Sequence, residues 1–199
     1  EGPLDVSAIE YMDSRALATV ADDVFARAGV ARPAVPGVLL VVQFEVAAGD
    51  DDTLDALQHV LDSVAPDADP HVALTGDDRG AARLFELREA VPAGLNARIA
   101  ATRARLQADI EKTAGDFIVP FDRLEESVAL YRKTYERYGL EYAIWGHVSD
   151  GNLHPNVVPS SLDDVARGRE AILEMGRAVV GMGGAPLAEH GVGRSALKQ

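Results

Sequence analysis

An Asp150-Gly151 turn between two apolar runs limits the possible folds of this chain more than any other sequence feature. Residues 140–148 and 153–158 flank the turn. Asp-Gly between such runs is a strong hairpin signal, because Gly accepts positive φ without steric strain. The two runs therefore predict neighbouring antiparallel strands, and we favour a sheet that is antiparallel or mixed.

Helical and strand patterns alternate along the rest of the chain. Apolar residues at helical spacing predict helices over residues 13–28, 52–64, 77–107, 122–138 and 162–180. Pro92 is expected to kink the third helix or to split it in two. Runs rich in β-branched residues predict strands over residues 37–46, 71–75 and 116–120, the first long enough to be central. We therefore expect an α+β domain, with an antiparallel or mixed sheet and helices packed on one face.

Composition limits the functions that the chain can have. Its 199 residues carry 32 Asp and Glu against 19 Lys and Arg, a net charge of −13, so we expect no nucleic-acid partner. Cysteine is absent, which excludes disulfides and thiolate metal sites and leaves His, Asp and Glu as metal ligands. No apolar run reaches the roughly 20 residues of a membrane-spanning helix. The first residue is not Met, and we interpret the start as a cut inside a longer chain.

The hairpin carries two of the five histidines. Whether the loop is Asp150-Gly151 or residues 149–152, His147 faces His154, and Trp145 faces Asn156. Directly opposed side chains have Cβ atoms about 5 Å apart on one side of the sheet, so two imidazoles can converge on one ion. Histidines are also common as surface residues or as hydrogen-bonded core residues. The spacing alone leaves both interpretations open.

A third metal ligand would come from the Gly-rich segment near the end of the chain. Glu189 lies there beside His190, and closely spaced glycines let backbone and ligand approach each other. Gly-rich loops also bind phosphate in P-loop proteins, but no strand, Lys-Ser/Thr pair or helix start accompanies this one. Glu189 is therefore the candidate carboxylate ligand.

Taken together, these segments resemble the signature of the FAD-linked oxidase C-terminal domain, in the vanillyl-alcohol oxidase superfamily. The segments are Gly146-His-Val-Ser-Asp-Gly-Asn-Leu-His154, Ala188-Glu-His-Gly-Val-Gly193, Leu87-Arg-Glu89 and Asp116-Phe-Ile-Val-Pro120. The family includes D-lactate dehydrogenases, the glycolate oxidase flavin subunit and D-2-hydroxyglutarate dehydrogenase. The resemblance runs from about residue 10 to the end. It implies a ferredoxin-like cap domain of an FAD-dependent enzyme that oxidises a 2-hydroxy acid.

The resemblance also implies roles for single residues. His147, His154 and Glu189 would bind a divalent metal, Zn, Mn or Fe, in those members that carry one. His190 would be the catalytic base, and Arg88 would bind the substrate carboxylate.

Two further residues match substrate-binding positions of the family. These are Asn156 and Lys112, although the spacing from Lys112 to Asp116 is longer than the family's. Pro92 stands where some relatives have a hydroxyl residue, which leaves the substrate class open. FAD would be bound mainly by a domain of the same parent chain, so we expect this fragment alone to be inactive.

Histidine, glutamate and arginine suit the oxidation of a 2-hydroxy acid on physical grounds. A neutral imidazole, with an ordinary pKa near 6.5, accepts a hydroxyl proton. Two imidazoles and one carboxylate leave metal positions open for substrate oxygens. The planar guanidinium of Arg suits a carboxylate. The alternative for Arg88 is a surface ion pair with Glu86 or Glu89.

Two other functions use the same residues. One is a non-haem iron enzyme with a two-His, one-carboxylate site, although such sites usually lie in all-β barrels. The other is a non-catalytic binding module, either metal-stabilised or metal-free. We expect a cytoplasmic protein; peripheral attachment to a membrane and assembly into a homo-oligomer stay open.

Overall fold

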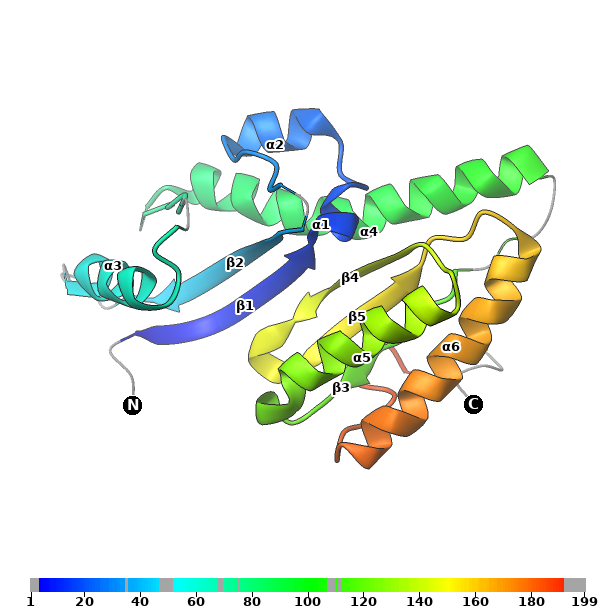
Figure 1. Ribbon diagram of the computed structural model, residues 1–199. Helices are drawn as coiled ribbons and strands as arrows, with labels where there is room; N and C mark the ends of the chain where they lie inside the picture. The colour runs from blue at the N-terminus through cyan, green and yellow to red at the C-terminus, as the bar shows by residue number, and fades with distance from the viewer. Residues whose placement is uncertain are drawn as a thin grey trace.

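The computed structural model describes residues 4–34, 36–46, 52–67, 70–74, 76–106, 110 and 112–191. They form a five-stranded antiparallel sheet with the strand order β2-β1-β4-β5-β3 (Figure 1). The strands are β1 (Asp5–Asp13), β2 (Val38–Glu45), β3 (Phe117–Ile118), β4 (Tyr142–His147) and β5 (Asn152–Val157). The α+β class and the antiparallel sheet are thus confirmed.

Six α-helices and two short 3-10 helices accompany the sheet in the described part of the chain. The α-helices are α1 (Ser14–Leu17), α2 (Asp22–Ala28), α3 (Asp52–Val64), α4 (Asp78–Leu106), α5 (Leu124–Arg137) and α6 (Leu162–Gly181). The 3-10 helices are η1 (Phe121–Arg123) and η2 (Val148–Asp150). None of the described helices combines the length and the apolar character that crossing a membrane requires.

The helices cover both faces of the sheet, whereas the sequence predicts helices on one face. Pleating sends alternate residues of β4 to opposite sides. Ala143 and Trp145 pack in a core with α1, α2 and α4, while Tyr142 and Ile144 pack in a second core with α5 and α6. We call the side that carries Trp145 the α4 face and the side that carries Ile144 the α5–α6 face. Figure 1 shows α4 and the pair α5 and α6 on opposite sides of the sheet.

The N-terminal region departs most from the predicted elements. Residues 13–28 predict one helix, but β1 ends at Asp13, α1 follows it, and α2 begins only at Asp22. The Asp13 carboxylate caps α1 by accepting a hydrogen bond from the N–H of Ala16 at 2.7 Å. Gly29 ends α2 in the left-handed conformation, so α2 ends where the helix predicted over residues 13–28 ends. The residues that share the predicted helical face are all buried in the core under α4: Leu17, Val20, Val24 and Phe25.

Two predicted strands differ from the structure. β2 lies at an edge of the sheet, although its β-branched run predicts a central strand. Its alternate residues Val38, Leu40 and Val42 are exposed, so the apolar run does not mean burial on both faces. Residues 71–74 do not form a strand, and Thr75 lies outside the described residues.

α4 is one continuous helix that passes through Pro92. Pro92 has no N–H to donate to the carbonyl of Arg88, one turn earlier, and such a gap bends a helix. Figure 1 shows α4 bending near its middle, so the predicted kink is present and the predicted split is not. Leu87, Val91 and Leu95 remain buried on one side of the helix and hold it against the sheet.

The hairpin is confirmed, but its register is shifted by two residues. η2 and Gly151 form the loop, so His147 pairs with Asn152 and Trp145 pairs with His154. The sequence predicts a loop at residues 150–151 or 149–152, and both would place His147 opposite His154. Because the shift is even, it keeps both histidines on the same face of the sheet.

Candidate metal centre

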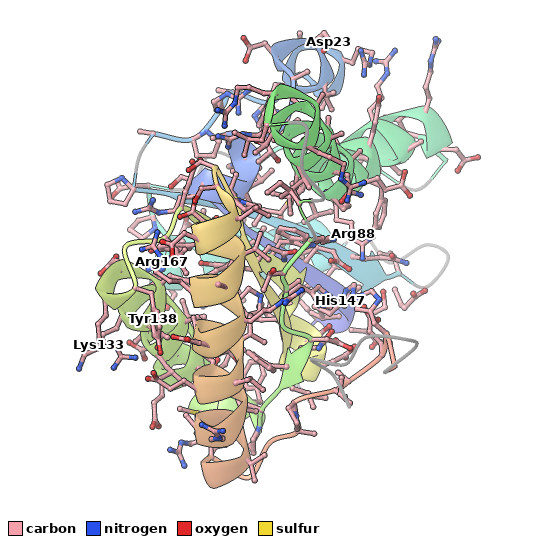
Figure 2. All side chains as sticks on the ribbon, turned by 90° about the vertical axis from the view of Figure 1, so that its right-hand side faces the viewer. Asp23, Arg88, Lys133, Tyr138, His147 and Arg167 are labelled. Atoms are coloured by element: carbon pink, nitrogen blue, oxygen red, sulfur yellow. The ribbon has the colours of Figure 1, made fainter. Side chains whose placement is uncertain are left out.

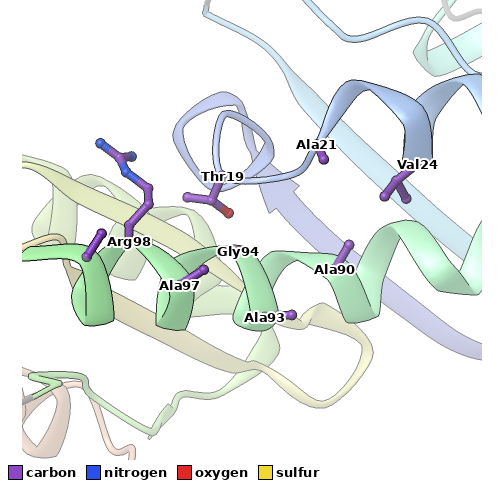
Figure 3. Close-up of a pocket in the computed structure, with 9 residues that line it drawn as sticks. Thr19, Ala21, Val24, Ala90, Ala93, Gly94, Ala97 and Arg98 are labelled. Carbon is purple, nitrogen blue, oxygen red and sulfur yellow. The ribbon is translucent and has the colours of Figure 1, made fainter. Parts of the chain in front are cut away.

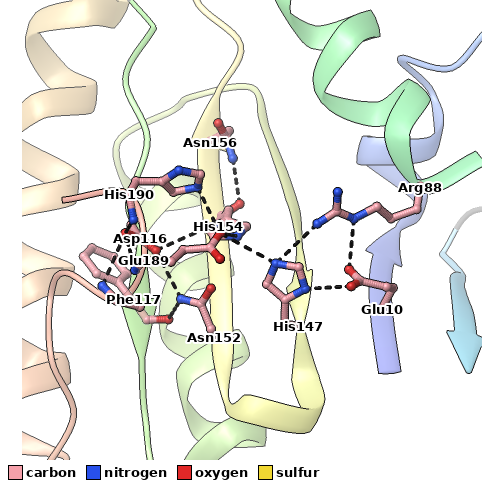
Figure 4. A network of polar contacts seen from close by, with 11 residues as sticks. Glu10, Arg88, Asp116, Phe117, His147, Asn152, His154, Asn156, Glu189 and His190 are labelled. Atoms are coloured by element: carbon pink, nitrogen blue, oxygen red, sulfur yellow. Dashed lines mark hydrogen bonds and ion pairs between the residues drawn. The ribbon is translucent and has the colours of Figure 1, made fainter. Parts of the chain in front are cut away.

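The α4 face of the β4–β5 hairpin becomes polar toward the loop. Trp145 belongs to the apolar core, but its partner across the hairpin is His154, and the next pair on the same face, nearer the loop, is His147 with Asn152. The imidazole centroids of His147 and His154 are 5.6 Å apart. The two rings are therefore diagonal neighbours rather than directly opposed (Figure 4).

Asp116 attaches the segment that follows α6 to this face. Its Oδ2 accepts hydrogen bonds from the N–H groups of Ala188, Glu189 and His190, at 3.3, 3.1 and 2.8 Å. Its Oδ1 accepts one from Asn152 Nδ2 at 3.2 Å. Burial works against ionisation, but these hydrogen bonds together lower the pKa of Asp116. The carboxylate thereby fixes the backbone that carries Glu189 and His190.

Glu189 Oε1 is the point on which three imidazoles converge. It lies 3.2 Å from His154 Nε2, 3.2 Å from His190 Nε2 and 3.6 Å from His147 Nε2 (Figure 4). The side chains of Glu189 and His190 are about half exposed, at 47% and 57%, whereas His154 is buried. One side of the cluster is therefore open to solvent.

Burial holds the His154 imidazole neutral. Burial lowers its pKa to about 4, against the opposing charges of Asp116 and Glu189. Its Nδ1 has no hydrogen-bond partner, and the Asp116 Oδ1 lies 3.6 Å away. A neutral imidazole with a free lone pair is the form that binds metal ions.

His147 is held by residues of two other elements. Glu10 of β1 places Oε1 2.7 Å from its Nδ1, and Arg88 of α4 places Nη2 3.3 Å from its Nε2. The hydrogen bond to Glu10, against the effect of burial, raises the pKa of His147. Burial opposes ionisation of Glu10, but the hydrogen bond and charge of His147 and the charge of Arg88 lower its pKa.

The donor set fits a divalent metal ion. Ligand atoms of Asp116, His154, Glu189 and His190 all lie within 4.8 Å of one another. The Asp116 oxygens already accept four hydrogen bonds, which makes that carboxylate a support rather than a ligand. His147 lies outside this group of four but reaches the same Glu189 oxygen. The predicted set of His147, His154 and Glu189 is thus brought together in space.

The other predicted site residues lie around this cluster. Arg88 makes its ion pair with Glu10 at 3.2 Å and not with Glu86, which pairs with Arg27. Asn156 is buried on β5, and its Nδ2 donates to the His154 carbonyl at 2.7 Å. Lys112 is exposed, with Nζ 5.8 Å from the centre of the Trp145 ring.

Glu10 and Asp116 belong to the site, but the sequence does not single them out. β1 is not among the predicted strands, and an acidic residue between the apolar Ile9 and Tyr11 was the available signal for Glu10. Asp116 lies in a predicted strand without a predicted role. Figure 2 shows Arg88 and His147 on one side of the molecule and Tyr138 and Arg167 on the other.

A groove in the described residues lies away from this cluster. It has a volume of about 570 Å³ and lies between α4 and the segment that runs from the end of α1 into α2 (Figure 3). Alanine side chains line much of it, and its one charged residue, Arg98, pairs with Glu141 at 2.8 Å. The groove therefore has few side chains that could bind a polar ligand or react with one, and the polar cluster remains the candidate site.

Comparison with known proteins gives a match over nearly the whole chain. The family described as FAD linked oxidases, C-terminal domain, matches residues 2–198. The glycolate oxidase subunit GlcD of Bacillus subtilis (strain 168) is 27% identical over 190 residues. That similarity covers 93% of this chain but 36% of the relative, so the chain spans about a third of that protein's length.

Proposed function

Because this chain belongs to the family of FAD-linked oxidase C-terminal domains, we propose that it is the substrate-binding and metal-binding part of a flavin-dependent oxidoreductase. Its substrate is a 2-hydroxy acid, which the enzyme oxidises to the 2-oxo acid. Glycolate, the acid in the name of the Bacillus relative, is the simplest compound of this class. The observation that carries the proposal is the convergence of three imidazoles on Glu189 Oε1.

The metal ligands in this proposal are His147, His154 and Glu189, and the ion is Zn, Mn or Fe. A divalent cation bound there lowers the pKa of a substrate hydroxyl. The low pKa of His154 keeps that ligand neutral at physiological pH. The exposed side of Glu189 leaves room for the oxygens of a small acid.

Arg88 binds the substrate carboxylate in this proposal. Its Nε is occupied by Glu10, which leaves terminal N–H groups for a second carboxylate. Asn156 has a buried Oδ1 without a partner, and Lys112 lies near Trp145 at the same face. These two residues would line the substrate position.

His190 takes the hydroxyl proton at Nε2 while the Cα–H bond breaks and the C=O bond forms. FAD, bound mainly by another domain of the same parent protein, supplies the acceptor for the hydride. His190 is exposed and lies beside Glu189, so it can reach a hydroxyl bound at the cluster. Its exposure suits a base that acts on a ligand reaching the cluster from outside.

The test uses the flavoprotein that carries this chain, with glycolate and D-lactate as substrates. His190→Gln should slow flavin reduction by about 10²- to 10⁴-fold, the range that general-base catalysis supplies, without loss of flavin. His59→Gln, an exposed histidine on α3, is the matched control and should reduce at the parental rate. Equal rates in the parent and His190→Gln would refute the base assignment.

A non-catalytic metal-stabilised module is the second candidate. Structural metal sites usually have four protein ligands, and four ligand groups do lie within 4.8 Å of one another. This candidate predicts that a chelator lowers the melting temperature while the parent protein shows no flavin reduction with any 2-hydroxy acid. Flavin reduction that depends on His190 would exclude it.

A further inference from the structure

One buried carboxylate joins the two halves of the candidate site. Glu10 lies on β1 directly opposite His147 of β4, and its side chain is 11% exposed. Oε1 lies 2.7 Å from His147 Nδ1, and Oε2 accepts from Arg88 Nε at 3.2 Å. Each oxygen therefore serves a different partner, one on the sheet and one on α4.

The contacts of His147 determine which ring nitrogen carries the proton in the neutral ring. Arg88 Nη2 lies 3.3 Å from Nε2, and a guanidinium can only donate hydrogen bonds. Nε2 must then offer its lone pair, so the hydrogen is on Nδ1, where Glu10 accepts it. The same Nε2 lies 3.6 Å from Glu189 Oε1, so a metal ion bound there would take the lone pair in place of Arg88.

We propose that Glu10 is a positioning residue that fixes the Nδ1–H tautomer of His147 and, with its other oxygen, the guanidinium of Arg88. This inference rests on the proposed function, in which His147 binds the metal and Arg88 binds the substrate. Histidines that bind metals generally donate their other N–H to a carboxylate or carbonyl, which orients the ring. Here the same carboxylate also sets the distance between ring and guanidinium.

A carboxylate is required for this role because two donors need two acceptors. Glutamine offers one acceptor oxygen and one NH₂ group, so it would present a donor to either His147 or Arg88. Glu10→Gln should therefore lose one of the two contacts while keeping the size of the side chain. Glu10→Asp keeps both acceptors on a shorter side chain and should restore part of the function.

A purely structural role for Glu10 makes a different prediction. Glu10 and Arg88 could simply attach α4 to the sheet, as Glu141 and Arg98 do at 2.8 Å farther along the same helix. Glu141→Gln is therefore the matched control, because it removes an ion pair to α4 outside the site. If both ion pairs only attach α4, the two variants should change stability and leave metal binding alone.

The first measurement is the tautomer of His147 in the full chain, from long-range ¹H–¹⁵N NMR at a pH where the ring is neutral. We expect a protonated Nδ1 and an unprotonated Nε2, and we expect Glu10→Gln to mix the two tautomers. A protonated Nε2 in the parent chain would overturn the inference. This measurement needs neither metal nor flavin.

The second measurement is calorimetric titration of the full chain with Zn²⁺. Glu10→Gln should weaken Zn²⁺ binding about 10- to 100-fold, the usual effect of removing such a supporting group, and Glu141→Gln should not. Tight Zn²⁺ binding that is equal in the parent chain and Glu10→Gln would overturn the positioning role and leave the proposed metal site intact. A parent chain with the expected tautomer but without Zn²⁺ binding would refute the metal site and support the role of Glu10.

Discussion

At the scale of single residues, the site combines one neutral imidazole, that of His154, with carboxylates that are held ionised. Burial keeps His154 neutral, with a pKa of about 4. Hydrogen bonds lower the pKa values of Glu10 and Asp116 although burial opposes this. Buried charges of this kind persist only when every oxygen has a partner. The supporting carboxylates are therefore as necessary to the cluster as its histidines.

Asp116→Asn should loosen the segment that carries Glu189 and His190. An amide has one acceptor oxygen and cannot replace the carboxylate that accepts three backbone N–H bonds and one from Asn152. We expect a loss of about 1–3 kcal/mol in the free energy of unfolding, the usual penalty for buried groups without partners. Urea unfolding measures the loss, and faster amide exchange at residues 188–190 locates it. Unchanged exchange there would contradict the anchoring role.

The sequence singled out the residues that converge in the cluster better than the residues that support them. His147, His154, Glu189 and His190 stand in short segments with a recognisable order, and the structure brings them together. Glu10 could not be found in this way, because its role depends on the pairing of β1 with β4 across more than a hundred residues. Such a contact is a property of the sheet order and leaves no local pattern.

At the scale of elements, the start of α6 shows how local contacts fix a helix. Ser161 Oγ accepts from the N–H of Asp164, which is the N-cap arrangement. The Asp164 carboxylate accepts in turn from the N–H and the hydroxyl of Ser160, at 2.8 and 2.7 Å. Burial opposes ionisation, but these hydrogen bonds and the one from Arg167 lower the pKa of Asp164.

Asp164→Asn should therefore destabilise the chain in a pH-dependent way. A carboxyl whose pKa is lower in the folded state stabilises the fold above its ordinary pKa of 3.8, and the effect is lost as the pH falls through the folded value. We expect a difference of about 1 kcal/mol near neutral pH that shrinks below pH about 4. Urea unfolding at several pH values measures it. Asp163→Asn, at an exposed neighbour, should show little effect, and a difference independent of pH would contradict the account.

The hairpin loop depends on the conformation of Gly151. Its φ is +74°, and a Cβ there would lie 2.1 Å from the Val119 carbonyl oxygen. Gly29 has nearly the same φ, +71°, but open space around it. Gly29→Ala should therefore lose about 1 kcal/mol from backbone strain alone, and Gly151→Ala clearly more. Thermal unfolding of both variants tests this, and equal losses would show that the contact with Val119 is unimportant.

Element types were easier to predict than pairing and position. Residues 52–64 form the predicted helix because the apolar period is local. Asp13 ends β1 and caps α1, so the helix predicted over 13–28 begins at Ser14. It is interrupted between Leu17 and Asp22, while its apolar residues stay in one core across the break. The predicted hairpin register is wrong by two residues because η2 extends the turn on its N-terminal side. Each difference depends on how the elements pack in the folded chain.

At the scale of the whole molecule, one sheet separates two apolar cores. Trp145, the single Trp, reports on the core under α4, and Tyr131, Tyr135 and Tyr142 report on the core under α5 and α6. Because β4 contributes to both cores, we expect one cooperative unfolding transition. Tryptophan fluorescence and near-ultraviolet circular dichroism of the tyrosines should give the same midpoint. Two separate midpoints would show that the cores fold independently.

The direct test of the account is the position of a metal ion in the folded chain. Crystals of the full chain grown with Zn²⁺ give that position from anomalous diffraction at the zinc edge. We predict one ion about 2.0–2.2 Å from His147 Nε2, His154 Nε2 and a Glu189 oxygen. A zinc ion bound elsewhere, or at this cluster without those three ligands, would contradict the proposed site.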